Sequence, residues 1–496
     1  MTTTARVNRI EEPSAAAATL RQNAIGVWGV AFFLLAGVAS LMVIGGLVPT
    51  SFAVTGLTAV PIYFLVVAVV LAVFLVGYLA MARLVPNAGA FYALVRQGLG
   101  RPVGVAAALV ALVAYNALQI AVYGIFGFTT ANFLHDKVGL GFPWWGYSLV
   151  AWAAVAVLGL LNVKLSAGIL GVLSIAEFLV IVALSVSGVA TRGAHPLAWD
   201  SLSPAHITFG FAGVGFLLAV LGYIGFENGP VLMEEARRPR RTVWIASFVV
   251  LVGIAALYVF APFAMVTFWG ADQIVSVAAQ AGPGTLFGMG AALLGDIALA
   301  LFITSAFGTL LTFHNIVGRY AYSLGRENVL PKVFGQTGQK SGAPWVASLA
   351  QSNLALFVIF GYALAHLDPL VQLFFWVGTT GGFAVLCLLA VTSASVVTYF
   401  ARHQKETLDV GVWQRFIAPS VAFLALITMA VFSVLNYPTL MGLPTDSVVA
   451  KVFPAALILP AVVGLIWALI LRARRRDVYE AIGHGPNAGL VPAVAR

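Results

Sequence analysis

The sequence predicts an all-α membrane protein with twelve transmembrane helices. Three observations lead to this fold class: the composition, the length of the apolar stretches and the placement of the basic residues. Of 496 residues, 61% are hydrophobic and only 9% are charged, and the mean hydropathy is +1.00. A soluble domain carries about 25% charged residues, so this chain lacks the polar side chains that a water-facing surface needs. The composition therefore excludes a soluble enzyme, a disordered protein and a nucleic-acid-binding domain.

Twelve apolar stretches have the length of a transmembrane helix, which is about 20 residues. They are continuous rather than alternating, which excludes a transmembrane β-barrel. The polar N-terminal segment precedes a full-length span, so we do not expect it to be a cleavable signal peptide. The predicted spans lie at 26–46, 59–82, 103–134, 147–163, 165–190, 207–231, 243–268, 285–317, 345–365, 370–400, 417–436 and 453–471.

The basic residues indicate the orientation, because cytoplasmic loops retain Lys and Arg. With the N-terminus inside and twelve crossings, 23 of the 26 basic residues fall on the cytoplasmic side, and only Lys137, Arg192 and Lys451 fall outside. One missed or invented span would destroy this asymmetry. We therefore expect a multi-pass protein of the cell membrane with both termini in the cytoplasm. The same asymmetry accounts for the formal net charge of +9 without a nucleic-acid partner.

Spans 1 and 6 contain residues that interrupt a helix. Span 1 includes "GVASLMVIGG" at 37–46, and span 6 includes "GYIGFENGP" at 222–230. Glycine and proline weaken helices, and broken backbone inside a bilayer must line a cavity or be buried in protein. Interruptions at corresponding places in two halves of a chain are typical of a transporter binding site. The alternative is that the glycines only permit close packing of helices.

Three segments carry a resemblance to a known family. "GYIGFENGPVLMEEARRPRR", "RYAYSLGRENVLPKVF" followed by "GAPWVA", and "RLVPNAGAFYALVRQGLGRPVG" resemble signatures of the amino acid–polyamine–organocation (APC) permeases. The resemblance extends from about Gly26 to Arg472. It implies the leucine-transporter-type fold, in which two inverted five-helix repeats are followed by two additional helices. The implied boundaries are a cytoplasmic tail at 1–24, repeat 1 at 25–190, repeat 2 at 206–400, helices 11 and 12 at 415–472, and a cytoplasmic tail at 473–496.

The resemblance further implies secondary transport of amino acids or related amines by alternating access. Exposed N–H groups of the first broken helix would bind the substrate carboxylate, and free carbonyls of both broken helices would bind its ammonium group. Family members often have Gly-Ser/Thr-Gly at the first break, where this chain has Ala39-Ser40-Leu41. Many also have a second proline after helix 6, where this chain has Trp244. The predicted substrate-binding residues are Val38, Ala39, Ser40, Leu41, Asn116, Gln119, Leu221, Gly222, Tyr223 and Phe226.

Polar residues in span 3 are the candidates for contact with the substrate side chain. Asn116, Gln119 and Tyr123 follow spacings of three and four, which places them on one face of a helix. They either line the pocket or form hydrogen bonds between helices. In span 8, the hydroxyls of Thr304 and Ser305 are of the kind that hold sodium in related folds, or are ordinary packing residues.

Ionisable residues at membrane depth are costly and usually face a cavity or a partner. The candidates are Glu177, Glu227 and Asp296. Related exchangers and proton-coupled permeases have a lysine at the position that matches Glu177, where sodium-driven relatives hold a sodium ion. A buried carboxylate there can exchange a proton, so Glu177 is either a coupling residue or a structural partner of a neighbouring helix. Glu227 is either a second coupling residue or a helix cap, and Asp296 is either functional or one half of a structural pair.

Motifs of enzymes and of metal sites are absent from the sequence. It contains no G-x-x-x-x-G-K-[ST] phosphate loop, no H-E-x-x-H and no G-x-S-x-G. The single cysteine, Cys387, rules out an intrachain disulfide, and His314 is more simply a core residue than a titrating one. We therefore expect no enzyme, no cofactor and no metal, with a small amino acid or amine, membrane lipid and protons as partners. The alternatives are a polyamine or inorganic-ion carrier of the same fold and, in another class, a polytopic membrane sensor or enzyme.

Overall fold

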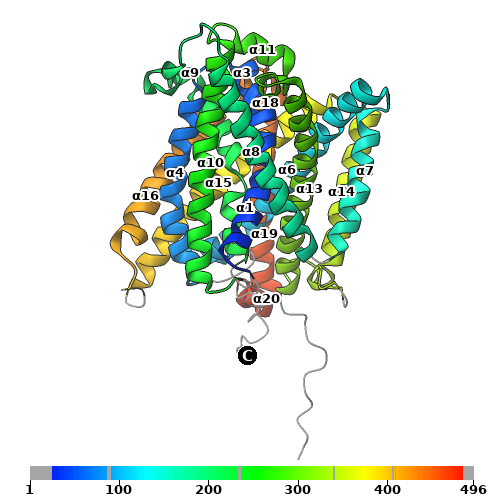
Figure 1. The fold of residues 1–496 in the computed structure, drawn as a ribbon. Coiled ribbons are helices and arrows are strands. Elements are labelled where there is room, and N and C mark those ends of the chain that lie inside the picture. Colours follow the sequence, from blue (N-terminus) through cyan, green and yellow to red (C-terminus); the bar gives the residue numbers. More distant parts are fainter. Residues whose placement is uncertain are drawn as a thin grey trace, which may run out of the picture.

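The protein forms a bundle of helices that run side by side (Figure 1). The computed structural model describes residues 25–85, 91–161, 163–232, 236–338, 341–404, 407 and 409–483, without the side chains of 163–170, 231, 239 and 240. The predicted N-terminal tail at 1–24 and the end of the predicted C-terminal tail lie outside these residues. Within them, the extended structure consists of one isolated bridge, between Ile25 and Ala236.

The first half of the chain contains α1 Val27–Val38, α2 Ser40–Met42, η1 Val43–Leu47, α3 Val48–Thr55, α4 Val60–Ala82, α5 Phe91–Leu99, α6 Arg101–Val138, α7 Trp144–Leu160, α8 Val163–Ala190, η2 Trp199–Leu202 and η3 Pro204–His206. The second half contains α9 Phe209–Tyr223, η4 Phe226–Leu232, α10 Pro239–Trp269, α11 Ile274–Ala281, α12 Gly284–Phe287, α13 Ala292–Arg326, η5 Lys332–Gly335, α14 Trp345–Leu364, η6 Pro369–Val377, α15 Gly378–Arg402, η8 Trp413–Ile417, α16 Ala418–Leu435, α17 Tyr437–Leu440, α18 Val448–Ala456, α19 Ile458–Arg474 and α20 Arg476–Ala481.

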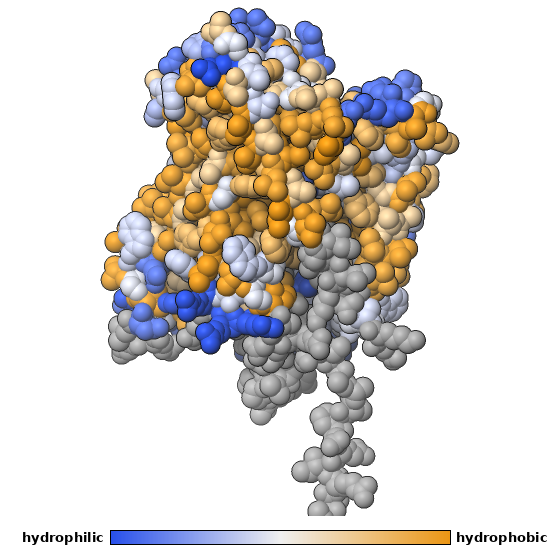
Figure 2. All heavy atoms as spheres, viewed as in Figure 1, coloured by the Kyte–Doolittle hydropathy of each residue, from blue (hydrophilic) through white to orange (hydrophobic). Residues whose placement is uncertain are grey.

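The all-α polytopic class is confirmed. In the described part of the chain, eleven helices are long and apolar enough to cross a membrane. The predicted span at 147–163 corresponds to α7, an apolar helix of 17 residues that is shorter than the others. Hydrophobic residues cover the middle of the face seen in Figure 2, and hydrophilic residues gather at its two ends. This distribution is the one that a bilayer requires of a spanning protein.

Both interruptions predicted in spans 1 and 6 are present. Helix α1 ends at Val38, because Ala39 adopts left-handed backbone angles with φ of 52°, and the chain then resumes as α2. Helix α9 ends at Tyr223, and Ile224 and Gly225 depart from helical geometry before η4 begins. Gly225 has φ of 117°, which only glycine adopts without strain.

The two interruptions lie against each other. A Cβ atom on Gly225 would be 2.5 Å from the carbonyl carbon of Gly37. The same two segments also meet further along, where the backbone N–H of Arg237 donates to the carbonyl of Ile25 at 2.7 Å. The broken helices therefore form one paired unit in the centre of the bundle.

One end of the bundle, here called the basic end, is formed by α5, the start of α6 and the C-terminal helix α20. Figure 1 shows α20 below the long helices, at the end opposite to α3 and α11. The short helix α20 belongs to the predicted C-terminal tail, but it is packed against the bundle: Val478 is 2% exposed and Ile482, just after the helix, is 0% exposed.

Candidate functional site

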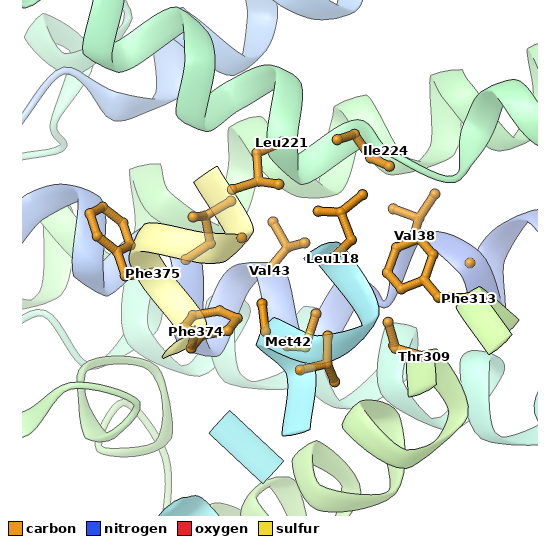
Figure 3. A pocket seen from close by; sticks show the side chains of 15 residues that line it. Val38, Met42, Val43, Leu118, Leu221, Ile224, Thr309, Phe313, Phe374 and Phe375 are labelled. Carbon is orange, nitrogen blue, oxygen red and sulfur yellow. The ribbon is translucent and has the colours of Figure 1, made fainter. Parts of the chain in front are cut away.

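A cavity of about 50 Å³ lies beside the two interruptions. Its walls come from five of the helices that are long enough to cross a membrane, and these helices are distant in sequence. Figure 3 shows Val38, Phe313 and Thr309 at one side of this space and Phe374 and Phe375 at the other. The lining residues are Gly37, Val38, Met42, Val43, Leu47, Leu118, Ala121, Val122, Leu221, Ile224, Thr309, Phe313, Phe374, Phe375 and Gly378.

The side chains around the cavity are almost entirely apolar. The only polar side chain among the lining residues is Thr309, and its hydroxyl donates to the carbonyl of Ser305 at 2.9 Å. The polar groups available to a ligand are therefore backbone N–H and C=O groups at the helix interruptions, where intrahelical partners are missing. Such a cavity suits a small molecule with a polar head and an apolar side chain.

Span 10 forms a wall of the cavity that no motif in the sequence predicted. Its first part is the π-helix η6, which supplies Phe374 and Phe375, and α15 begins with the lining residue Gly378. A π-helix is rare and is frequently found at functional sites. The residues themselves gave no signal, because phenylalanine and glycine in an apolar span are most often packing residues.

The predicted substrate-binding residues at the interruptions are buried, except for the partly buried Leu221, and they divide into two groups. Val38 and Leu221 line the cavity. The others belong to the breaks without being among its lining residues. For example, the Tyr223 hydroxyl donates to the carbonyl of Phe64 at 3.1 Å, and the Phe226 ring lies 6.2 Å from that of Phe74. These side chains hold the interruptions in place. The residues of this second group are Ala39, Ser40, Leu41, Gly222, Tyr223 and Phe226.

Gln119 of span 3 belongs to a network between helices, and neither it nor Asn116 is part of the cavity wall. Gln119, which is 0% exposed, lies 3.4 Å from His314 Nδ1 and accepts from Gln351. His314 Nε2 in turn lies 2.7 Å from the Ser348 hydroxyl. Asn116 donates to the carbonyl of Leu112 on its own helix. The cavity is lined instead by their helix neighbours Leu118, Ala121 and Val122.

Glu177 lies where α8, the first interruption and α13 meet. Its carboxylate accepts a hydrogen bond from the Ser305 hydroxyl at 2.9 Å and another from the backbone of Leu41, and the residue is 5% exposed. Ser305, Thr309 and Phe313 are spaced by four residues, so they lie on one face of α13. This face connects Glu177 to the cavity. Thr304, by contrast, is exposed and donates to the carbonyl of Leu301.

Glu227 is fully enclosed by hydrogen-bond donors. It is 1% exposed and accepts from the Tyr115 hydroxyl at 2.5 Å, from the Gly225 backbone N–H at 2.8 Å and from Asn228 at 3.3 Å. The Tyr78 hydroxyl donates to its main-chain carbonyl at 2.9 Å. This arrangement caps the second interruption. It also forms a polar layer next to the cavity, because the Tyr115 ring lies 6.1 Å from that of the lining residue Phe313.

Asp296 is not deep inside the membrane-spanning part, as the predicted span boundary implied. It lies near the start of α13, its side chain is 48% exposed, and it pairs with Lys137 at 2.7 Å. The predicted span began too early, at 285, because residues 284–287 form the separate short helix α12 and α13 begins only at Ala292. Among the described residues, no group of three or more His, Cys, Asp or Glu side chains could hold a metal ion.

Two comparisons with known proteins bear on this site. A family model described as "Amino acid permease" matches residues 25–466, which includes both interruptions and every lining residue of the cavity. The chain is also 27% identical over 308 residues to a protein of Bacillus subtilis (strain 168) named "Uncharacterized amino acid permease YecA". That alignment covers 60% of this chain and 68% of the Bacillus protein.

Proposed function

Because the chain belongs to the amino acid permease family, we propose that it carries amino acids with apolar side chains across the cell membrane by alternating access. The observation that carries this proposal is the cavity, which combines apolar side-chain walls with the backbone of two interrupted helices. A site of this kind binds the α-carboxylate and α-ammonium groups through backbone dipoles. The side chain of the substrate then displaces water from the apolar walls, which favours binding.

We place the substrate carboxylate at the start of α2. The first N–H groups of a resumed helix have no partner within that helix, and Glu177 already takes the one on Leu41. The neighbouring Met42 lines the cavity, so its N–H is the best placed for the substrate. The ammonium group faces the carbonyls at the ends of α1 and α9, near Val38 and Leu221.

Glu177 is proposed as the coupling residue. It joins α8 to the first interruption and to α13, so a change in its charge alters a contact between three helices. Protonation would remove that charge and bias the equilibrium between inward-open and outward-open states. In the change between these two states the inverted repeats at 25–190 and 206–400 would move. Ser40 and the rest of the first interruption would move with them. In this arrangement the basic end and both termini are cytoplasmic, as the distribution of Lys and Arg favours.

A polyamine carrier of the same fold is the second candidate, and the cavity argues against it. A polyamine site needs carboxylates to neutralise several ammonium groups, and none of the lining residues is acidic. A sensor or enzyme of another class is disfavoured, because the model of the amino acid permease family matches residues 25–466.

Counterflow into proteoliposomes tests the proposal. Vesicles loaded with leucine, isoleucine, valine or phenylalanine should accumulate the labelled amino acid, whereas vesicles loaded with lysine, glutamate or putrescine should not. Phe374→Ala, which enlarges the cavity, should shift the preference towards larger side chains. One methylene group more or less in an apolar pocket changes the free energy that discriminates between two substrates by about 1–3 kcal/mol. Phe357→Ala is the matched control, because Phe357 is 73% exposed on α14. Equal counterflow of putrescine and leucine would overturn the proposal.

A further inference from the structure

A cleft at the basic end has the composition of an anion site. It has a volume of about 410 Å³ and is lined by Arg101, Arg472, Arg476, Tyr479 and Glu480, which come from α6, α19 and α20. Three guanidinium groups face a single carboxylate, that of Glu480. Arginine binds phosphate oxygens through paired N–H donors, which makes such a cluster suited to a phosphate group.

Hydrogen-bond donors in the cleft remain available. Glu480 uses its carboxylate on Arg476, at 3.0 Å, and its main-chain carbonyl on Arg101, at 3.1 Å. The buried Nε of Arg101 has no hydrogen-bond partner within the described structure. The cleft therefore combines excess positive charge with an unsatisfied donor, and both are stabilised by an anion.

The position of the cleft identifies the source of that anion. Arg101 is the first residue of α6 and Arg472 lies in the last turn of α19, so both stand at the ends of apolar helices that are long enough to cross a membrane. This is the depth of the lipid phosphates. Just before Arg472, the side chains of Ile466 and Leu469 are 52% and 53% exposed. They offer an apolar surface for acyl chains next to the basic cleft, which a free phosphate would not need.

We propose that the headgroup phosphate of an anionic phospholipid binds between Arg101, Arg472 and Arg476, with its acyl chains against α19. Basic pockets between transmembrane helices on the cytoplasmic side bind anionic headgroups in this way. The site differs from diffuse attraction to the membrane surface, because it needs the arginines of the cleft and not their neighbours. Arg474 and Arg475 are exposed on the same segment but do not line the cleft.

The bound lipid would hold α20 against the bundle. Arg101 stacks on the ring of Tyr479 at 5.3 Å, so it already connects α6 to α20. Beyond α20, the backbone N–H of Gly483 donates to the buried carboxylate of Glu327 at 2.6 Å. Glu327 also accepts from the Tyr92 hydroxyl. The end of α20 is therefore attached to α5 and to the segment after α13.

This attachment continues towards the cavity. The Tyr320 hydroxyl accepts from the backbone N–H of Phe91 at 3.3 Å, and the Tyr320 ring lies 5.8 Å from that of Tyr115, which bonds Glu227. Lipid binding would thus stabilise the contacts that join α20 to α5 and α13. Neither lipid binding nor this stabilisation depends on the proposed transport function.

Native mass spectrometry of the purified protein tests the site, with phosphatidylglycerol as the probe and phosphatidylcholine as the neutral comparison. Arg472→Gln with Arg476→Gln should weaken phosphatidylglycerol binding about 30-fold, because each arginine near the surface contributes about 1 kcal/mol. The matched control, Arg474→Gln with Arg475→Gln, removes the same charge and should leave binding unchanged. An equal loss in both double variants, or no loss in either, overturns the proposal. Displacement of the lipid by millimolar inorganic phosphate would assign the cleft to a soluble anion instead.

A labelling experiment tests the effect on α20. Ile482→Cys in a Cys387→Ala background places a single thiol at a fully buried position. In vesicles of phosphatidylcholine alone, maleimide should label this thiol faster than in vesicles that contain phosphatidylglycerol. The difference should vanish when Arg472→Gln and Arg476→Gln are added. Identical rates in the two kinds of vesicle would refute the stabilisation of α20. Neither readout requires a transport substrate, so a failure of the proposed function would leave both interpretable.

Discussion

Gly225→Ala should damage the contact between the two interrupted helices. Gly225 has φ of 117°, and an added Cβ would lie 2.5 Å from the carbonyl carbon of Gly37 and 2.7 Å from the backbone nitrogen of Val38. Backbone strain of this kind costs about 1–3 kcal/mol, and overpacking against a neighbour costs about 1–3 kcal/mol more. Both contacting atoms belong to backbone, so no side-chain rotation relieves the clash. The interruptions must separate, which distorts the cavity wall at Val38.

The assay is thermal unfolding of the purified variant, followed by binding of apolar amino acids. We expect a lower unfolding midpoint and weaker binding for Gly225→Ala. Gly378→Ala is the control, because this glycine also lines the cavity but has φ of −62°, and its new Cβ would lie an ordinary 3.4 Å from that of Ala121. In a helix that change stabilises by about 0.4–1 kcal/mol. If the two variants behave alike, the close approach at Gly225 has no role and the reasoning is refuted.

Three further predictions concern the site. Glu177→Gln should retain substrate binding but make uptake much less dependent on external pH and on a proton gradient. Ser305→Ala keeps the carboxylate and should keep that dependence. An unchanged pH dependence of uptake for Glu177→Gln would rule out coupling. Ser40→Leu should abolish amino acid binding, measured by calorimetry, while the protein stays folded. The reason is that the larger side chain crowds the N–H groups of the first interruption. Wild-type affinity in this variant would place the carboxylate site elsewhere. Tyr115→Phe should lower the unfolding midpoint, because a buried polar group that loses its hydrogen-bond partner costs about 1–3 kcal/mol. Tyr147→Phe, which removes an exposed hydroxyl, should not.

The sequence by itself determined the class of the protein and the places where its helices break. Apolar stretches of spanning length and few charges permit only helices in a bilayer, so the fold class followed from composition and length. The second interruption followed from local chemistry, because Gly225 and Pro230 weaken a helix. The first occurs at Ala39, a position that the family resemblance indicated and that no glycine or proline occupies. The need of Glu177 for a partner was also visible, since a carboxylate in an apolar span needs a partner or a cavity, and Ser305 is that partner.

Only the tertiary structure decided which side chains face the cavity. The spacing of Asn116 and Gln119 showed that they share a helix face, but the rotation of α6 against α13 and α14 turns Gln119 towards His314 and Gln351. The cavity instead receives apolar residues of α6, together with Phe374 of span 10, which no pattern distinguished.

The same limit applies at the basic end, where Arg101 and Arg476 are more than 370 positions apart in sequence and yet line one cleft. The physical reason is that periodicity describes each helix relative to its own axis. The neighbour that a given face meets depends on how distant segments pack together, and that information is distributed over the whole chain.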